Sequence, residues 1–131
     1  MSAKVAIIAS SGGIFDAYKV FNIATAAAAT EAEVAIFFTL EGLNLIHKEA
    51  QHQLPLPAGK EQIAEGVKNA NVPSIPELSA MAREMGVKFI ACQMTMDVMG
   101  LKKEDFVDGI EVGGAVTFID FAKDADITLS F

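Results

Sequence analysis

The feature that most constrains the fold is the start of the chain, where a short apolar run leads through a tight turn into an alanine-rich segment. Lys4–Ala9 is a continuous run of β-branched and small apolar residues, which is typical of a strand buried on both faces of a sheet. Ser10–Gly13 ends this run. Phe15–Ala29 then repeats apolar residues at three- and four-residue spacing, which predicts a helix. Together these segments favour a parallel sheet covered by helices.

Strands and helices alternate along the rest of the chain. Further strands are predicted at Glu33–Thr39, Val87–Ala91, Ile110–Val112 and Ile127–Phe131. Short helices are predicted at Glu41–Lys48, Gln93–Met99, Lys102–Val107 and Gly113–Lys123, the last with Val116, Ile119 and Ala122 inward. Because this alternation produces parallel, right-handed crossovers, we predict a three-layer α/β fold. It has a mostly parallel sheet of about five strands, with helices on both faces, and residues 1–131 form a single domain.

One further helix has clear start and stop signals. Ser74 is a good N-cap, Pro76 suits the first turn, and Glu77 stands three residues after the serine as a capping-box partner. The expected apolar face is Leu78, Met81, Ala82 and Met85, and Gly86 ends the helix.

The segment from about residue 52 to 73 breaks the alternation. It is punctuated by Pro55, Pro57, Gly59, Asn69, Asn71 and Pro73. There is room only for a brief helix around Glu61–Lys68. We expect a mobile excursion over one edge of the sheet, in which Leu54 and Leu56 are candidate contacts for a partner.

The charge balance limits the classes of partner. Ten Lys and Arg against 17 Asp and Glu give a formal charge of −7, and the basic residues are scattered singly. A protein that binds nucleic acid needs a basic face, so no nucleic-acid partner is expected. Phosphate-bearing small molecules remain possible because backbone amides at a helix start can hold an anion.

Neither a membrane span nor secretion is expected. The longest apolar region, Ala24–Ala35, is interrupted by polar residues and is shorter than the roughly 20 residues that a span requires. Met1–Lys4 leads directly into the first strand without a signal-type segment. The single Cys92 cannot form an internal disulfide, which fits a cytoplasmic protein.

The loops after the first three strands carry the residues that could do chemistry. Since the carboxyl ends of parallel strands open on one edge, these loops should share one cleft. The candidate nucleophile is Cys92, and the candidate pocket residues are Ser10, Ser11, Gly12, Gly13, Thr39, Gly42, Gln93, Met94, Thr95 and Met96. Because a helix follows Cys92, the amides of the next three residues should point at its sulfur.

The reactivity of Cys92 depends on a modest change in its pKa. An ordinary thiol, with a pKa of about 8.5, is only about 3% thiolate at pH 7, and a fall of one unit raises that to about a quarter. Such a fall corresponds to about 1.4 kcal/mol, most of which a helix start can supply. The alternative is a small, inert core residue, which is common for cysteine. The strand-to-helix position favours the reactive interpretation.

Two sets of side chains contain metal-ligating atoms: Cys92, Met94, Met96 and Met99, and His47, Glu49 and His52. On a helix the first set does not converge, so copper(I) is not favoured over core packing. The second set lacks the i,i+3 or i,i+4 spacing of a helical zinc site. We predict no metal and no cofactor.

The glycine pairs have a structural interpretation and a functional one. Ser10–Gly13 could hold an anion on its amides, but it lacks both GxGxxG and the Walker lysine. A tight strand-to-helix turn is the simpler interpretation. Gly113 and Gly114 could likewise be a sharp entry into the last helix.

Several strings together carry a family resemblance. They are Phe37-Phe38-Thr39-x-x-Gly42-Leu43, Ile75-Pro76-Glu77-Leu78, Ile90-Ala91-Cys92-Gln93-Met94-Thr95-Met96-Asp97-Val98-Met99-Gly100 and Gly113-Gly114-Ala115. On these residues the chain resembles the DsrE/DsrF-like family of small sulfur-relay proteins over nearly its whole length. The string around Cys92 is the specific part of the match.

The resemblance implies a flavodoxin-like α/β domain that forms a homo-oligomer. It also implies that Cys92 carries sulfur as a persulfide or passes it to a partner such as a TusA-like or rhodanese-like protein. In one departure, Leu40 and Glu41 stand where relatives often place an aromatic pair. If Glu41 faces the cleft, its charge opposes thiolate formation.

Our leading hypothesis is therefore a cytoplasmic sulfur carrier or sulfurtransferase that acts through Cys92. In this hypothesis the amides of Gln93 and Met94 stabilise the sulfur charge, Thr39 and Ser11 hydrogen-bond the transferred sulfur, and Met94 and Met96 shape an apolar pocket. The alternatives are a non-catalytic module that binds a small ligand or a protein, and a thiol redox sensor that uses the same cysteine with an external thiol.

Overall fold

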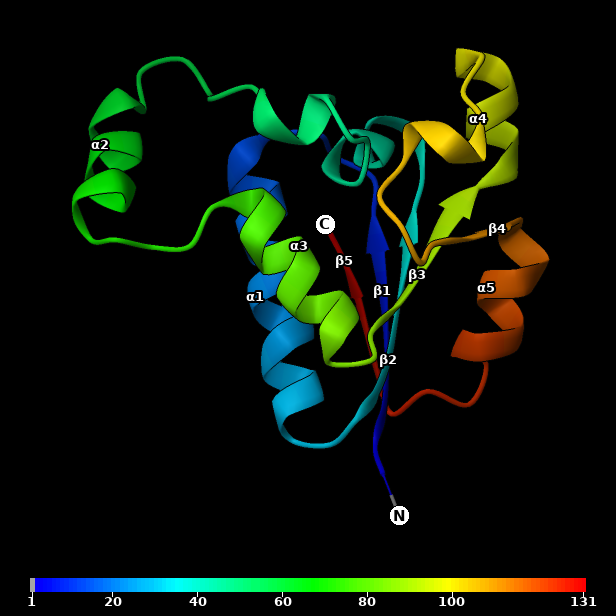
Figure 1. Ribbon diagram of the computed structural model, residues 1–131. Coiled ribbons are helices and arrows are strands. Elements are labelled where there is room, and N and C mark those ends of the chain that lie inside the picture. The colour runs from blue at the N-terminus through cyan, green and yellow to red at the C-terminus, as the bar shows by residue number, and fades with distance from the viewer. Residues whose placement is uncertain (1) are drawn as a thin grey trace.

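The computed structural model describes residues 2–131, which form one five-stranded sheet with helices on both faces (Figure 1). Its strands are β1 (Lys4–Ala9), β2 (Glu33–Phe38), β3 (Lys88–Cys92), β4 (Glu111–Gly113) and β5 (Ile127–Ser130). The spatial order is β4-β3-β2-β1-β5, and every neighbouring pair is parallel. The predicted α/β class and parallel sheet are confirmed, and the predicted strands differ from these bounds by at most a few residues.

One face of the sheet is covered by α1 (Ile14–Ala29) and α3 (Ile75–Glu84), which lie side by side in Figure 1. The core on this face is centred on three fully buried rings, Phe21 from α1, Phe38 from β2 and Phe89 from β3. Their centroids are 5.1–6.2 Å apart. Aromatic packing of this kind adds to the free energy gained by burial, so these rings anchor both helices to the sheet.

Within residues 2–131, the helix that covers the opposite face is α5 (Ala115–Ala122). A smaller apolar cluster lies beneath it, and its buried members are Ala6, Ala35, Phe37, Ile90, Cys92, Phe118 and Phe121. The predicted inward face of this helix is correct only at Ala122, which packs against the cluster, and is wrong at Val116 and Ile119, which are 75% and 57% exposed. Phe118 and Phe121 point inward instead, since two aromatic rings bury more apolar area than the smaller side chains would.

Two predicted helices are shorter and tighter than expected. Leu40–Leu45, which follows β2, and Lys103–Asp105, which precedes β4, are 3-10 turns. The helix α4 (Gln93–Met99) forms as predicted and ends at Gly100, which adopts the left-handed conformation. All three segments lie at or near the carboxyl edge of the sheet, around the end of β3 (Figure 1).

The excursion contains α2 (Glu61–Asn69), close to the predicted brief helix. Figure 1 shows α2 standing apart from the body of the molecule, and none of its residues is buried. Leu54, proposed from sequence as a partner contact, instead packs into the main core at 9% exposure, and Leu56 is half-buried.

The start of α3 has the predicted capping box. The Ser74 hydroxyl oxygen accepts a hydrogen bond from the Glu77 amide at 3.3 Å, and the Ser74 amide donates to the Glu77 carboxylate at 3.2 Å. The predicted apolar face is only partly correct. Leu78 and Ala82 are buried with Ile75, but Met81 and Met85 are both 43% exposed.

We expect Ser74→Ala to lower the free energy of unfolding by about 1 kcal/mol, while Ser74→Asn, which keeps a capping oxygen, retains most of it. The hydroxyl and the backbone amide of Ser74, which lie beside the Glu77 carboxylate, hold the pKa of Glu77 below its ordinary value. The contribution of the Glu77 carboxylate to the free energy of unfolding is therefore fully present above the pKa of an ordinary glutamate. It is lost as the pH falls through the lowered pKa of Glu77. Urea unfolding at several pH values measures both effects, and equal stability of the two variants at pH 7 would contradict this role.

Candidate functional site

Cys92 lies at the carboxyl edge of the sheet, as the last residue of β3 and the N-cap of α4. Gly113 of β4 is its partner in the register on one side. On the other side the paired residues Phe38 and Ala91 are followed directly by Thr39 and Cys92. Cys92 is thus flanked by a hydroxyl-bearing residue and by a residue without a side chain. It is 5% exposed and packs on the α5 face of the sheet.

Two threonine hydroxyl groups, those of Thr95 and Thr39, lie close to the Cys92 sulfur. The Thr95 side chain, on the first turn of α4, is 2% exposed, and its Oγ1 lies 3.3 Å from the Oγ1 of Thr39. The Leu40 amide donates a hydrogen bond to the same Thr95 oxygen at 3.1 Å. These contacts join the loop after β2 to the helix after β3, and they bring the sequence-predicted Thr39 and Thr95 together near the end of β3.

The electrostatic surroundings of Cys92 act in two directions. Burial raises the pKa of the thiol, but the hydroxyls of Thr95 and Thr39 and the backbone amides of Thr95 and Met94 outweigh that effect. The pKa of Cys92 therefore lies below its ordinary value. The Cys92 side chain makes no capping hydrogen bond to α4. The helix amides therefore act on the sulfur without the short contact that they make with the side-chain oxygen of an ordinary N-cap residue.

Glycine allows the loops after β1 and β2 to come together. A Cβ placed on Gly42 would lie 2.6 Å from the Ala9 carbonyl carbon and closer still to its oxygen. One on Gly12 would lie 2.8 Å from the Glu41 carbonyl oxygen. The Thr39 amide also donates to the Ala9 carbonyl at 3.0 Å. The predicted convergence of these two loops is present, with backbone packed against backbone.

Much of the Ser10–Gly13 loop is engaged elsewhere. Both the amide and the hydroxyl of Ser10 donate to the Phe131 carbonyl, at 2.8 and 3.2 Å. The Ile14 amide, at the start of α1, donates to the Pro55 carbonyl at 3.0 Å. Gly13 lies near the same Pro55 carbonyl, and Ser11 is half-buried. This geometry favours a strand-to-helix turn over an anion site.

A mainly apolar cavity of about 320 Å³ lies beside Thr95. Its lining residues are Leu40, Glu41, Met94, Thr95, Val98 and Met99. Met94 therefore lines the cavity as proposed, whereas Met96 is 3% exposed and packs in the main core with α1. The side chain of Gln93 donates to Asp97 at 2.9 Å. Glu41 also lines this cavity, an orientation that the sequence had left open.

Sequence reasoning missed Leu40, Val98 and Met99 at this cavity. The signal for the last two was present, since Val98 and Met99 stand three and four residues after Thr95 and share its helix face. Leu40 carried no such signal. Its position depends on a left-handed backbone conformation, φ +50°, that leucine rarely adopts.

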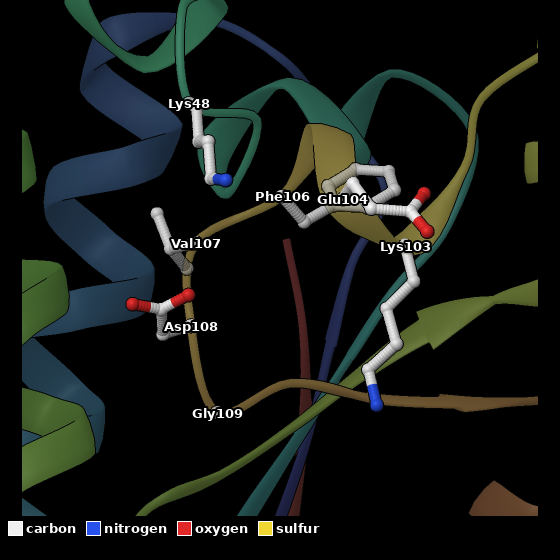
Figure 2. A pocket seen from close by; sticks show the side chains of 7 residues that line it. All are labelled: Lys48, Lys103, Glu104, Phe106, Val107, Asp108 and Gly109. Carbon is white, nitrogen blue, oxygen red and sulfur yellow. The ribbon is translucent and has the colours of Figure 1, made fainter.

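The cavities around Lys48, Tyr18 and His47 contain neither Cys92 nor the pocket residues predicted with it. Within residues 2–131, no three His, Cys, Asp or Glu side chains are grouped to hold a metal ion. The His47 Nδ1 accepts from the Glu49 and Ala50 amides, both at 3.1 Å. A separate cavity of about 260 Å³ is lined by Phe106, Lys48 and Lys103 among others, and Figure 2 shows the two ammonium groups well apart. This cavity does not concentrate positive charge for an anion.

The helices of residues 2–131 include none that combines the length and the apolar character needed to cross a membrane.

Comparisons with known proteins cover the whole chain. Residues 1–65 and 56–130 match the model of the DsrE/DsrF/DrsH-like family. The chain is 35% identical over 153 aligned residues to the sulfur carrier protein DsrE2 of Allochromatium vinosum, covering 96% of both proteins. It is 30% identical over 152 residues to the uncharacterized protein YrkE of Bacillus subtilis, covering 96% of this chain and 95% of the relative.

The fold also resembles a solved structure. The crystal structure of the YchN protein from E. coli superposes with a TM-score of 0.72 at 17% sequence identity, and the match covers 100% of both chains. At this identity the likeness concerns the fold alone.

Proposed function

The chain belongs to the DsrE/DsrF/DrsH-like family, and on that premise we propose that it is a sulfur carrier or sulfurtransferase that holds sulfane sulfur as a persulfide on Cys92. The 35% identity to a sulfur carrier protein over nearly the full length of both chains supports a sulfur-relay role in general. The observation that carries the assignment to Cys92 is its place at the end of β3, beside two hydroxyl groups and the amides of α4.

The proposed transfer has two balanced steps. The Cys92 thiolate attacks the outer sulfur of a donor persulfide, the donor S–S bond breaks, and the donor leaves as a thiolate. Cys92 then carries the outer sulfur as a persulfide. An acceptor thiolate attacks that sulfur, the new S–S bond at Cys92 breaks, and Cys92 leaves as a thiolate. No net oxidation or reduction occurs.

A lowered thiol pKa assists both steps. It raises the thiolate fraction of empty Cys92, and it makes Cys92 a better leaving group when sulfur passes on. The amides of Met94 and Thr95 and the hydroxyl of Thr39 support the thiolate in this proposal, with the amide of Thr95 in the role that the sequence assigned to Gln93. The apolar side chain of Met94 limits water at the neighbouring cavity. The hydrogen bond from Ser11 to the transferred sulfur stays a proposal, as do the pocket roles of Ser10, Gly12 and Gly13.

The partners in this proposal are proteins that donate and accept sulfur, such as TusA-like or rhodanese-like proteins. The proposed form is a cytoplasmic homo-oligomer without a metal or cofactor. A non-catalytic binding module is the second candidate, and the burial of Cys92 at 5% exposure favours it.

We expect the purified protein to gain about 32 Da, the mass of one sulfur atom, when it is incubated with a persulfide donor, because only Cys92 can form the persulfide. Cys92→Ser should gain nothing, and a thiol reductant should remove the increment from the wild type. Intact-protein mass spectrometry measures all three.

Because Cys92 has little exposed surface, the donor is supplied both as a small polysulfide and as a persulfidated rhodanese. A wild type that gains no mass with either, or an equal gain on Cys92→Ser, would overturn the carrier function and favour the binding module.

A further inference from the structure

The Thr95 hydroxyl has a fixed acceptor role. The amide of Leu40 can only donate, and it lies 3.1 Å from the Thr95 Oγ1. The Thr95 oxygen therefore accepts this hydrogen bond, which leaves its own hydrogen to be donated elsewhere. At 2% exposure this hydrogen cannot go to bulk water, so it must go to a buried acceptor.

A count of hydrogens shows what the Thr39–Thr95 pair offers the sulfur. The two hydroxyls hold two hydrogens, and the 3.3 Å contact between their oxygens uses one, whichever of the two donates. The other hydrogen remains. Cys92 lies next to both residues. Thr39 and Cys92 directly follow the paired residues Phe38 and Ala91 on neighbouring strands. Thr95 is the third residue of α4, whose N-cap is Cys92. Within residues 2–131 neither hydroxyl donates to a backbone carbonyl. Both hydroxyls lower the pKa of the Cys92 thiol, which makes its sulfur the neighbouring acceptor for the remaining hydrogen.

The backbone of Leu40 is strained at the residue whose amide donates to the Thr95 hydroxyl oxygen. Leu40 has φ +50°, a conformation that is uncommon for residues with a Cβ. Packing does not explain it, because the Leu40 side chain is 56% exposed. The conformation instead delivers the amide to the Thr95 oxygen, and this hydrogen bond helps to keep it.

From these contacts we propose that Thr95 is a positioning residue for the chemistry of Cys92. The Leu40 amide holds the Thr95 oxygen, and the oriented Thr39–Thr95 pair then supplies one hydrogen bond to the Cys92 sulfur. This inference rests on the proposed function and identifies what prepares the sulfur for it. The same hydrogen bond stabilises the thiolate before attack and again when Cys92 is the leaving group.

The test compares three variants through the pH profile of Cys92 alkylation by iodoacetamide. Thr95→Val keeps the side-chain shape but removes the hydroxyl and the acceptor of the Leu40 amide. We expect its alkylation midpoint to move to higher pH and its rate at pH 7 to fall about ten-fold, as for one pKa unit. Thr95→Ser keeps the hydroxyl, and its rate should stay within about two-fold of the wild type.

Thr39→Val is the matched control, because it removes the other hydroxyl of the pair. The Thr95 hydroxyl then still has the sulfur as its acceptor, so the shift should be smaller than for Thr95→Val. Three outcomes overturn the proposal: a Thr95→Val profile that overlays the wild type, a Thr95→Ser shift as large as that of Thr95→Val, or a larger effect from Thr39→Val.

A measurement on the wild type keeps the proposal testable should Thr95→Val fail to fold. The Leu40 amide should be protected from hydrogen exchange although its side chain is exposed, and exchange at the rate of an open loop overturns the proposal. Failure of the proposed function gives a different result. A Thr95-dependent alkylation profile without sulfur uptake rejects the carrier alone, and sulfur uptake with a profile insensitive to Thr95 rejects the positioning role alone.

Discussion

Gly42→Ala is expected to prevent the protein from reaching its native fold. The added Cβ would lie 2.6 Å from the Ala9 carbonyl carbon, and closer to the oxygen, at the end of β1. Both are backbone atoms, so no side-chain rotation relieves the overlap. β1 cannot move aside, because it is hydrogen-bonded between β2 and β5. We expect a loss of more than about 4 kcal/mol, the range reserved for severe core disruption.

Gly66→Ala is the matched control for this change. Gly66 lies inside α2, and a Cβ there would meet nothing within 4 Å. The substitution should leave the stability unchanged or raise it by up to about 1 kcal/mol, because alanine favours the helix. Circular dichroism and urea unfolding compare the two variants. A cooperative transition at the wild-type midpoint for Gly42→Ala would show that the loop after β2 can reorganise.

Phe89→Ala is expected to produce the second large loss, about 3–5 kcal/mol. The ring is fully buried, 5.1 Å from Phe38 and 5.9 Å from Phe21 between centroids. Its removal leaves a cavity where α1 packs on the sheet, and the neighbouring rings cannot collapse into the space without moving α1 and β2.

Exposed Ile63 supplies the control for Phe89. Ile63 is 51% exposed on α2, and Ile63→Ala should change the free energy of unfolding by less than about 0.5 kcal/mol. Urea unfolding again measures both variants. A loss below about 1 kcal/mol for Phe89→Ala would mean that the three rings do not form the tightly packed centre of the main core.

The family resemblance and the hypothesis that Cys92 carries sulfur were both inferred from short strings of residues. The strings around Cys92 and Gly113 already pointed to the family that the comparisons show. Placing Cys92 between a buried strand and a helix required only the apolar run before it and the helical spacing after it. The pairing of Thr39 with Thr95 was not visible, since the two residues are 56 positions apart in the sequence.

The sequence by itself determines those features that depend on residues close together in the chain. The run Lys4–Ala9, the capping box of Ser74 and Glu77, and the turn at Gly100 each depend on neighbours within a few positions, and all three form as expected. The inward face of α5 was predicted wrongly at Val116 and Ile119, because that helix is apolar on several sides and only its contact with β1 and β4 selects Phe118 and Phe121. The left-handed Leu40 and the close approach of Gly42 to β1 likewise depend on groups from distant parts of the chain. These features arise from packing between separate segments, a free energy that no local pattern encodes.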